Sequence, residues 1–168
     1  MRRPRILAVL PLGFLALTSC GGDSATGPFG GGLFLRLKVD GTLYEYSLEG
    51  GLLGVFGGSG RYNNLNITGN DAGATSALVM VWDTVRVSAR SYDEFHGTVP
   101  AGSFGTILSF TDPTGTDYAS GDAGTDANVT ISEISDSQIA GTFDGVLAAA
   151  GHANVTVTEG SFRVARFN

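Results

Sequence analysis

Apolar and polar residues alternate along most of the chain from residue 33 onward, which is the pattern of β-strands that bury one face. In the segment 33–39 every second residue is Leu or Val, while Arg36 and Lys38 fall on the opposite face. Asp40-Gly41 follows directly, and the alternation resumes over 42–48. Because a two-residue hairpin turn needs positive φ, which Asp-Gly tolerates, these residues predict a β-hairpin. Further strands are expected over 62–68, 76–82, 84–90, 103–110, 129–134, 138–148, 154–159 and 161–167.

The expected strands are short and joined mostly by short turns, and no segment shows a convincing apolar period of 3.6 residues. About nine or ten such strands in roughly 135 residues predict an all-β fold, an antiparallel β-sandwich with a single core. A β-barrel is the alternative that the sequence leaves open. Two details stay open as well. The glycine-rich segment 49–61 is either an edge strand or a flap over a ligand, and Gly160 marks either a hairpin or a bulge.

The first twenty residues are typical of a secretory leader. Three arginines flank the start of an apolar run over 6–17, and this run is too short to span a bilayer as a helix, which needs about 20 apolar residues. Leu17-Thr18-Ser19-Cys20 resembles the lipobox of bacterial lipoproteins. The resemblance implies cleavage before Cys20 and acylation of Cys20, whose acyl chains together would anchor the protein stably. An ordinary cleaved signal or an uncleaved anchor is the alternative.

These features divide the chain into three parts. Residues 1–19 are expected to be a signal peptide, residues 20–32 the lipidated cysteine and a Gly/Ser-rich tether, and residues 33–168 a single β domain. A flexible tether of this length spans about 20 Å. The expected location is the bacterial cell envelope, with the lipid on Cys20 as the membrane contact. By analogy with enteric lipoproteins, where Asp after the cysteine favours the inner membrane, Gly21 favours the outer membrane.

Charge and cysteine content exclude several classes of partner. The full chain carries ten basic and sixteen acidic residues, a net charge of −6. Removal of residues 1–19 takes away three arginines, which leaves seven basic and sixteen acidic residues and a net charge of −9. This surface argues against nucleic acid, whose phosphates are neutralised by Lys and Arg. The single cysteine, Cys20, excludes an intrachain disulfide and a thiolate zinc site.

Short motifs beyond the leader carry a family resemblance. They are Lys38-Val39-Asp40-Gly41 and the segments 97–99, 129–133, 140–143 and 155–162. Together with the lipobox, they resemble an uncharacterised family of small all-β bacterial lipoproteins of unknown function. The resemblance implies the fold class. Because the motifs are strand and turn patterns, it implies no catalytic or binding residue.

The segment 111–127 is the most suggestive candidate for a binding site. Asp112, Asp117, Asp122 and Asp126 are interspersed there with Gly, Ser and Thr. Calcium takes six to eight oxygen ligands, and an acidic, glycine-rich loop can wrap around it, so these four aspartates are candidate calcium ligands. Their spacing matches neither the EF-hand loop nor the nonapeptide calcium repeat. The alternative is a solvated loop whose Asp and Gly residues form turns.

Enzyme signatures are largely missing from the sequence. It contains no nucleophile elbow and no zinc-protease motif, and its histidines are His96 and His152. His96 follows Asp93-Glu94 closely and is the one candidate general base, although an exposed loop histidine is the ordinary interpretation. The sequence therefore predicts a lipid-anchored, non-catalytic binding or interaction module of unknown ligand, with calcium as the one candidate cofactor. The alternatives are a structural envelope protein that associates only with other proteins and, less favoured, a small hydrolase.

Overall fold

The computed structural model describes residues 32–47, 53–57, 63–71, 74–84, 86–95 and 104–166. Within these ranges the chain forms strands and no helix, so no helix of the described part is long and apolar enough to cross a membrane. The leader, Cys20, most of the tether and His96 lie outside the described residues. The strands are β1 (Phe34–Val39), β2 (Thr42–Ser47), β3 (Leu53–Gly57), β4 (Asn63–Asp71), β5 (Thr75–Asp83), β6 (Ser91–Asp93), β7 (Phe104–Thr111), β8 (Asp117–Ala119), β9 (Asp126–Ile134), β10 (Gln138–Leu147) and β11 (Val155–Ala165).

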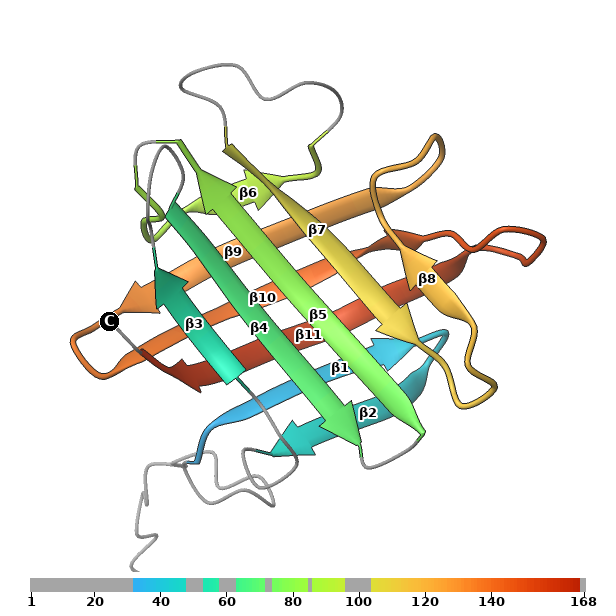
Figure 1. The fold of residues 1–168 in the computed structure, drawn as a ribbon, viewed down its shortest axis with the longest axis horizontal. Helices are drawn as coiled ribbons and strands as arrows, with labels where there is room; N and C mark the ends of the chain where they lie inside the picture. The colour runs from blue at the N-terminus through green and yellow to red at the C-terminus, as the bar shows by residue number, and fades with distance from the viewer. Residues whose placement is uncertain are drawn as a thin grey trace, which may run out of the picture.

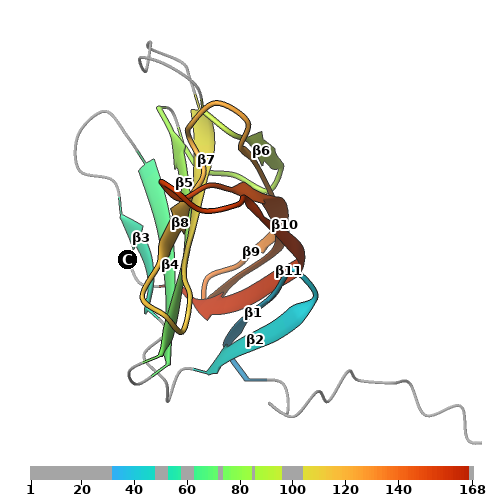
Figure 2. The ribbon, with the colours of Figure 1, turned by 90° about the vertical axis from the view of Figure 1, so that its right-hand side faces the viewer.

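The strands form two antiparallel sheets. Sheet A has the order β2-β1-β11-β10-β9-β6, and sheet B has the order β3-β4-β5-β7-β8. The sheets pack face to face, and their strands cross steeply, as in orthogonal sandwich packing (Figures 1 and 2). The prediction of an all-β antiparallel sandwich is therefore confirmed, and the barrel alternative is wrong.

The core lies between the two sheets and follows from the alternation in the sequence. In β1, for example, Leu35, Leu37 and Val39 are buried, whereas Arg36 is exposed on the other face. Burying an aliphatic or aromatic side chain of this size contributes about 1.5–3 kcal/mol to folding. Both sheets supply the largest fully buried side chains, which include Tyr92, Phe162, Leu35, Leu37, Leu65, Ile67, Leu108, Ile131, Ile139 and Leu147.

The predicted hairpin at Asp40-Gly41 is confirmed. Asp40 has φ of 47° and Gly41 has φ of 83°, and Val39 pairs with Thr42 across the turn. The Asp40 carboxylate also accepts a hydrogen bond of 2.8 Å from the Thr156 backbone N–H at the start of β11. This contact ties the first hairpin to the last strand, beside which β1 lies in sheet A.

The last strand resolves the alternative that the sequence left open at Gly160. Residues 155–165 form one continuous strand, and its pairing with both β1 and β10 shifts register near Glu159 and Gly160. Glu159 has φ of 51°, so it is the extra residue of a β-bulge. A Cβ atom on Gly160 would lie 2.3 Å from the Phe143 carbonyl oxygen, which explains why glycine follows the bulge.

The strand predicted over 84–90 is wrong, because the described residues of this range form none. Asp83 turns the chain instead. Its Oδ1 accepts a hydrogen bond of 3.2 Å from the Arg86 backbone N–H, and its Oδ2 pairs with Arg90 Nη2 at 2.5 Å. An Asp side chain that bonds the backbone three residues ahead competes with strand pairing. The short strand β6 follows this turn and forms the edge of sheet A.

The two edge strands of sheet B lie in segments for which the sequence did not clearly predict a strand: one had two open interpretations, and the other was interpreted as a loop. The segment 49–61 contains β3, which pairs with β4 at one edge and so supports the edge-strand interpretation. The segment 111–127 contains β8, which pairs with β7 at the other edge. Ala119 in β8 also exchanges two backbone hydrogen bonds, of 2.9 and 3.0 Å, with Ala148 after β10. This bridge joins sheet B to sheet A at one corner of the sandwich.

Candidate functional site

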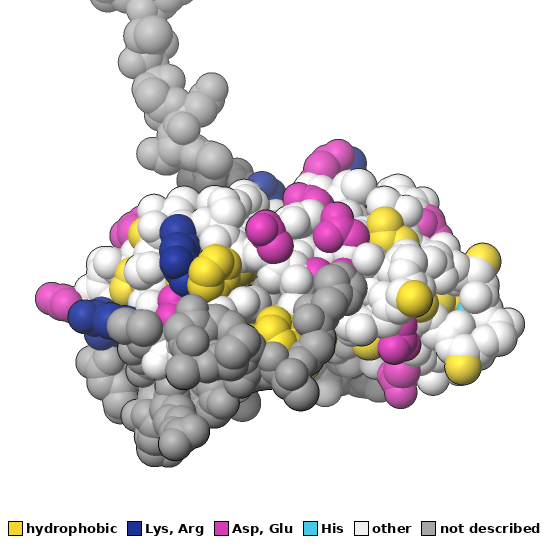
Figure 3. All heavy atoms as spheres, turned by 90° about the horizontal axis from the view of Figure 1, so that it is seen from above, with side chains coloured by type: hydrophobic (Ala, Val, Ile, Leu, Met, Phe, Trp, Pro, Cys, Tyr) yellow, Lys and Arg dark blue, Asp and Glu magenta, His cyan; other side chains and the backbone are white. Residues whose placement is uncertain are grey.

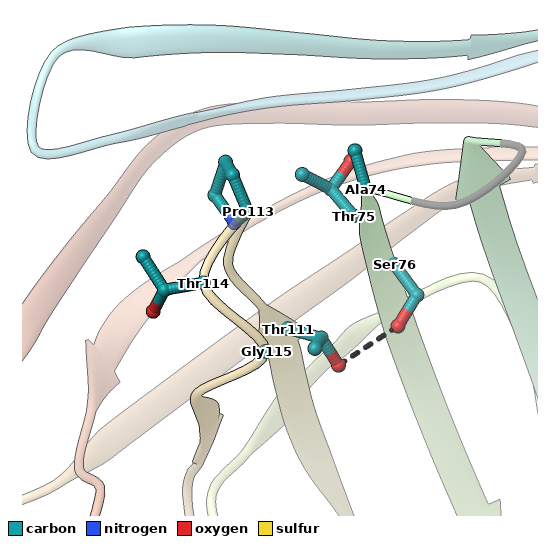
Figure 4. Close-up of a pocket in the computed structure, with 7 residues that line it drawn as sticks. All are labelled: Ala74, Thr75, Ser76, Thr111, Pro113, Thr114 and Gly115. Carbon is teal, nitrogen blue, oxygen red and sulfur yellow. Dashed lines mark hydrogen bonds between the residues drawn. The ribbon is translucent and has the colours of Figure 1, made fainter.

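A cleft lies at one end of sheet B, between the β4–β5 turn and the β7–β8 turn (Figure 4). It is an open surface cleft with a volume of about 420 Å³. The Ser76 and Thr111 side chains point toward each other, whereas Thr75 leaves β5 on the opposite, buried side and Thr114 points away from both (Figure 4). The residues that line it are Ala74, Thr75, Ser76, Thr111, Pro113, Thr114 and Gly115.

Strand pairing places two of these hydroxyls opposite each other. Ser76 near the start of β5 pairs with Thr111 at the end of β7. Ser76 Oγ donates a hydrogen bond of 2.9 Å to Thr111 Oγ1 (Figure 4), and Thr111 Oγ1 donates one of 2.7 Å to Asp117 Oδ1. Ser76 and Thr111 each donate their hydroxyl proton to the next group in this series of hydrogen bonds. The Ser76 oxygen can therefore still accept a hydrogen bond from a ligand.

The β7–β8 turn closes around one carboxylate. Asp112 Oδ1 accepts hydrogen bonds from Thr114 N at 2.8 Å, Thr114 Oγ1 at 2.7 Å and Thr116 N at 2.9 Å. These donors, the Thr114 hydroxyl first and the Thr116 amide next, hold the pKa of Asp112 below its ordinary value. Asp112 is therefore ionised at neutral pH, and it lies in the chain between two residues that line the cleft.

A buried hydrogen bond supports the cleft from within the sandwich. Thr75 is 7 % exposed, and its Oγ1 accepts a hydrogen bond of 3.0 Å from the Tyr46 hydroxyl. Tyr46 belongs to β2, so this bond joins sheet A to sheet B at the cleft. Burial raises the pKa of Tyr46, which keeps its hydroxyl protonated as a donor. A wall held by such a bond is ordered before any ligand arrives, which lowers the entropy cost of binding.

The chemistry of the lining suits a neutral ligand. It offers hydroxyl and backbone groups and contains no Lys, Arg or His side chain. Phosphate and carboxylate ligands are normally held by such cations, and the ionised Asp112 would repel them. A ligand with several hydroxyl or amide groups would instead donate hydrogen bonds to the Ser76 and Thr114 oxygens, whose own protons are donated within the protein.

The four aspartates singled out in the sequence take separate positions. Asp112 and Asp117 lie at the cleft and bond to the threonines described above. Asp122 lies in the turn before β9, and Asp126 Oδ2 accepts a hydrogen bond of 3.0 Å from Asn128 Nδ2. In the part of the chain that the structure describes, no three His, Cys, Asp or Glu residues are grouped to hold one metal ion. Calcium binding by this loop stays a prediction.

Sequence reasoning pointed to one wall of the cleft and missed the other. The acidic segment 111–127 was predicted as a binding site because of its aspartates, but the residues with which it lines the cleft include Thr111, Pro113 and Thr114. No sequence motif singles out Thr75 or Ser76, because their partners are distant in the sequence: Tyr46 lies 29 positions from Thr75, and Thr111 lies 35 positions from Ser76. His96, the candidate general base, lies outside the described residues.

No protein-family model, no curated protein and no solved structure matches the chain. The resemblance to the uncharacterised lipoprotein family therefore stays a prediction from the sequence.

Proposed function

We propose that the protein is a lipid-anchored binding module of the bacterial cell envelope, held at the outer membrane by the lipid on Cys20. The leader and its lipobox support the anchor. The sandwich supports a folded module separate from the anchor, because β1 begins at Phe34 and every residue of the described core lies C-terminal to the predicted tether. The hydroxyl-lined cleft is the observation that supports binding, and no catalytic step is proposed for it.

The proposed ligand is neutral and rich in hydroxyl groups, as is a sugar unit of an envelope glycan. Two features support this class. Ser76, Thr111 and Thr114 each bring a hydroxyl oxygen to the lining of the cleft, and such oxygens accept hydrogen bonds from a polyol. The ionised Asp112 and the acidic net charge of −6 both disfavour an anionic ligand.

Amide chemical shifts measured by NMR during titration test this proposal. With N-acetylglucosamine or glucose as the probe, we expect shifts confined to residues 74–76 and 111–116. Inorganic phosphate should leave the same amides unchanged. In Ser76→Ala the affinity should fall about tenfold, which corresponds to the loss of one hydrogen bond of about 1.4 kcal/mol.

The matched control is Thr142→Ala, which removes a hydroxyl from the exposed face of β10 in sheet A. This variant should bind both sugars as the wild type does. Sugar titrations that leave residues 74–76 and 111–116 unshifted, or that shift them equally in Ser76→Ala, would count against the cleft as a sugar site. A response to phosphate instead would contradict the charge argument.

A further inference from the structure

The outward faces of the two sheets differ in charge. The outer face of sheet A mixes acidic and basic side chains, and charged groups of both signs stand along the sheet A side of the molecule, at the upper margin of Figure 3. Strand register places the following charged residues on the outer face of sheet A: Arg36, Lys38, Glu45, Asp93, Asp126, Glu133, Asp144, Glu159 and Arg163. Lys38 Nζ, for example, pairs with Glu159 Oε1 at 2.7 Å. This is the ordinary surface of a solvated sheet.

The outer face of sheet B is almost uncharged. Strand register and the burial of alternate residues place one row of each strand on this face. Among the described residues of these rows, Asp117 on the edge strand β8 is the one charged side chain. The others are Asn64, Asn66, Thr68, Asn70, Ser76, Leu78, Met80, Trp82, Gly105, Ile107, Ser109, Thr111 and Ala119.

The centre of this face is apolar, although a solvated antiparallel face is normally polar. Met80 in β5 pairs with Ile107 in β7, and Leu78 precedes Met80 on the same face. All three side chains are half-buried. Uncharged amides and hydroxyls flank them, with Asn66 opposite Met80 on one side and Ser109 opposite Leu78 on the other. An apolar centre with Met, few charges and a polar rim is the composition of a protein–protein interface.

We infer that this face of sheet B pairs with the same face of a second copy of the chain. Each copy that begins at Cys20 carries seven basic and sixteen acidic residues, a net charge of −9, so two copies repel each other wherever carboxylates meet. The described part of this face brings a carboxylate only at its β8 edge, whereas the face of sheet A would oppose several. Uncharged Asn, Ser and Thr side chains carry both donors and acceptors, so they can pair with their own copies across a two-fold axis.

The size of the face is of the right order for such a pair. At about 3.3 Å per residue and about 4.8 Å between strands, the strands of sheet B cover roughly 500 Å² of sheet plane before side chains add to it. A standard interface buries about 800 Å² per partner. The packing of Trp82 disfavours a glycan here, because this residue is 8 % exposed and its ring packs edge-on against the Phe95 ring, with 5.2 Å between the ring centroids. It therefore offers no open ring on which a sugar stacks.

Sedimentation velocity of the full chain tests the inference. The protein is kept in detergent with micelles in large excess, so that two acyl anchors rarely share one micelle. We expect a dimer whose Kd is on the order of 10 µM or tighter. Met80→Asp places a charge at the centre of the face and should raise Kd at least tenfold, while Thr142→Asp on the outer face of sheet A should leave Kd unchanged. If Met80→Asp fails to fold, Ser109→Asp on the same face replaces it.

Photo-crosslinking in cells provides a second measurement that identifies the occupant. A photo-reactive residue in place of Ser109 should give a product of twice the mass of the chain, and one in place of Thr142 should not. A wild type that sediments as a monomer overturns the inference. So do equal dimer products from both positions, and a Ser109 product that contains only a different protein or a glycan.

Discussion

The buried hydrogen bond from Tyr46 to Thr75 joins the two sheets at the cleft, and its removal is the most informative perturbation of the fold. Tyr46→Phe keeps the ring in the core but leaves Thr75 Oγ1 buried without its donor. A hydrogen bond of this kind contributes about 1 kcal/mol net, and an unsatisfied buried partner costs about 1–3 kcal/mol. We therefore expect the free energy of unfolding to fall by about 1–2 kcal/mol, and the melting midpoint by about 4–8 °C.

A double-mutant cycle in urea separates the hydrogen bond from other effects. Thr75→Val should cost about as much as Tyr46→Phe, and the double variant should cost less than the sum by about 1 kcal/mol, because the same bond is lost only once. Tyr44→Phe is the matched control. The Tyr44 ring packs on Phe110 at 4.8 Å, its hydroxyl makes no hydrogen bond to the described residues, and its loss should change stability by less than about 0.5 kcal/mol. If the losses in free energy of unfolding of the two single variants add up in the double variant, the hydrogen bond between Tyr46 and Thr75 does not contribute as proposed.

The same site predicts a dependence of stability on alkaline pH. Burial raises the pKa of Tyr46 above its ordinary value, so the folded protein keeps this proton after the unfolded chain has lost it. The contribution is complete below about pH 10 and is lost as pH rises further. The fall in the free energy of unfolding above pH 10 should therefore be smaller in Tyr46→Phe than in the wild type. Equal falls in both proteins would contradict the assigned pKa direction.

Three further predictions concern the bulge and the acidic loop. Gly160→Ala should lower the free energy of unfolding, measured in urea, by about 2–3 kcal/mol, because the added Cβ meets a backbone carbonyl. Gly151 has φ of 78° and open space around it, so Gly151→Ala should lower the free energy of unfolding by only about 1 kcal/mol. Equal losses in the two variants would contradict the crowding at Gly160. Thr114→Val should raise the pKa of Asp112 in a carboxyl NMR titration. A depressed carboxyl pKa stabilises the fold above the pKa of the unfolded state, and this contribution is lost as pH falls through the pKa of the folded state, so the variant should lose less stability on acidification. An unmoved pKa would refute the hydrogen-bond assignment. Millimolar calcium should raise the melting midpoint over that in chelator if the loop gathers around the ion, and Asp122→Ala should remove the rise; equal midpoints would end the calcium prediction.

Local sequence signals predicted most of the strands because burial on one face of a sheet leaves a period of two. The hairpin at Asp40-Gly41 was also readable, since its turn conformation is a property of those two residues. The error at 84–90 has a different origin. The alternation there resembles a strand, but the Asp83 carboxylate bonds the backbone of Arg86 and the guanidinium of Arg90 and turns the chain away. The alternation of apolar and polar residues over 84–90 therefore gave no sign of the turn, because the turn depends on hydrogen bonds of the Asp83 side chain.

The site was less predictable than the fold, because its parts meet only through strand order. Ser76 and Thr111 lie 35 positions apart and become neighbours when β5 pairs with β7. The uncharged face of sheet B depends in the same way on which strands lie side by side. By contrast, the Asx turn at Asp112 is local, and the Asp-Pro-Thr-Gly sequence at 112–115 already favours it.

The proposed function depends most directly on the lipid at Cys20. Intact-mass and peptide mass spectrometry of the full chain, expressed in a bacterium and recovered from membranes, measures it. We expect a mature protein that begins at Cys20, carries fatty acyl groups on that residue, and remains with the outer membrane on fractionation, whereas Cys20→Ala remains unacylated. An unmodified N-terminus at another residue, or wild-type protein that is recovered free of membranes, would contradict the anchor and the function proposed from it.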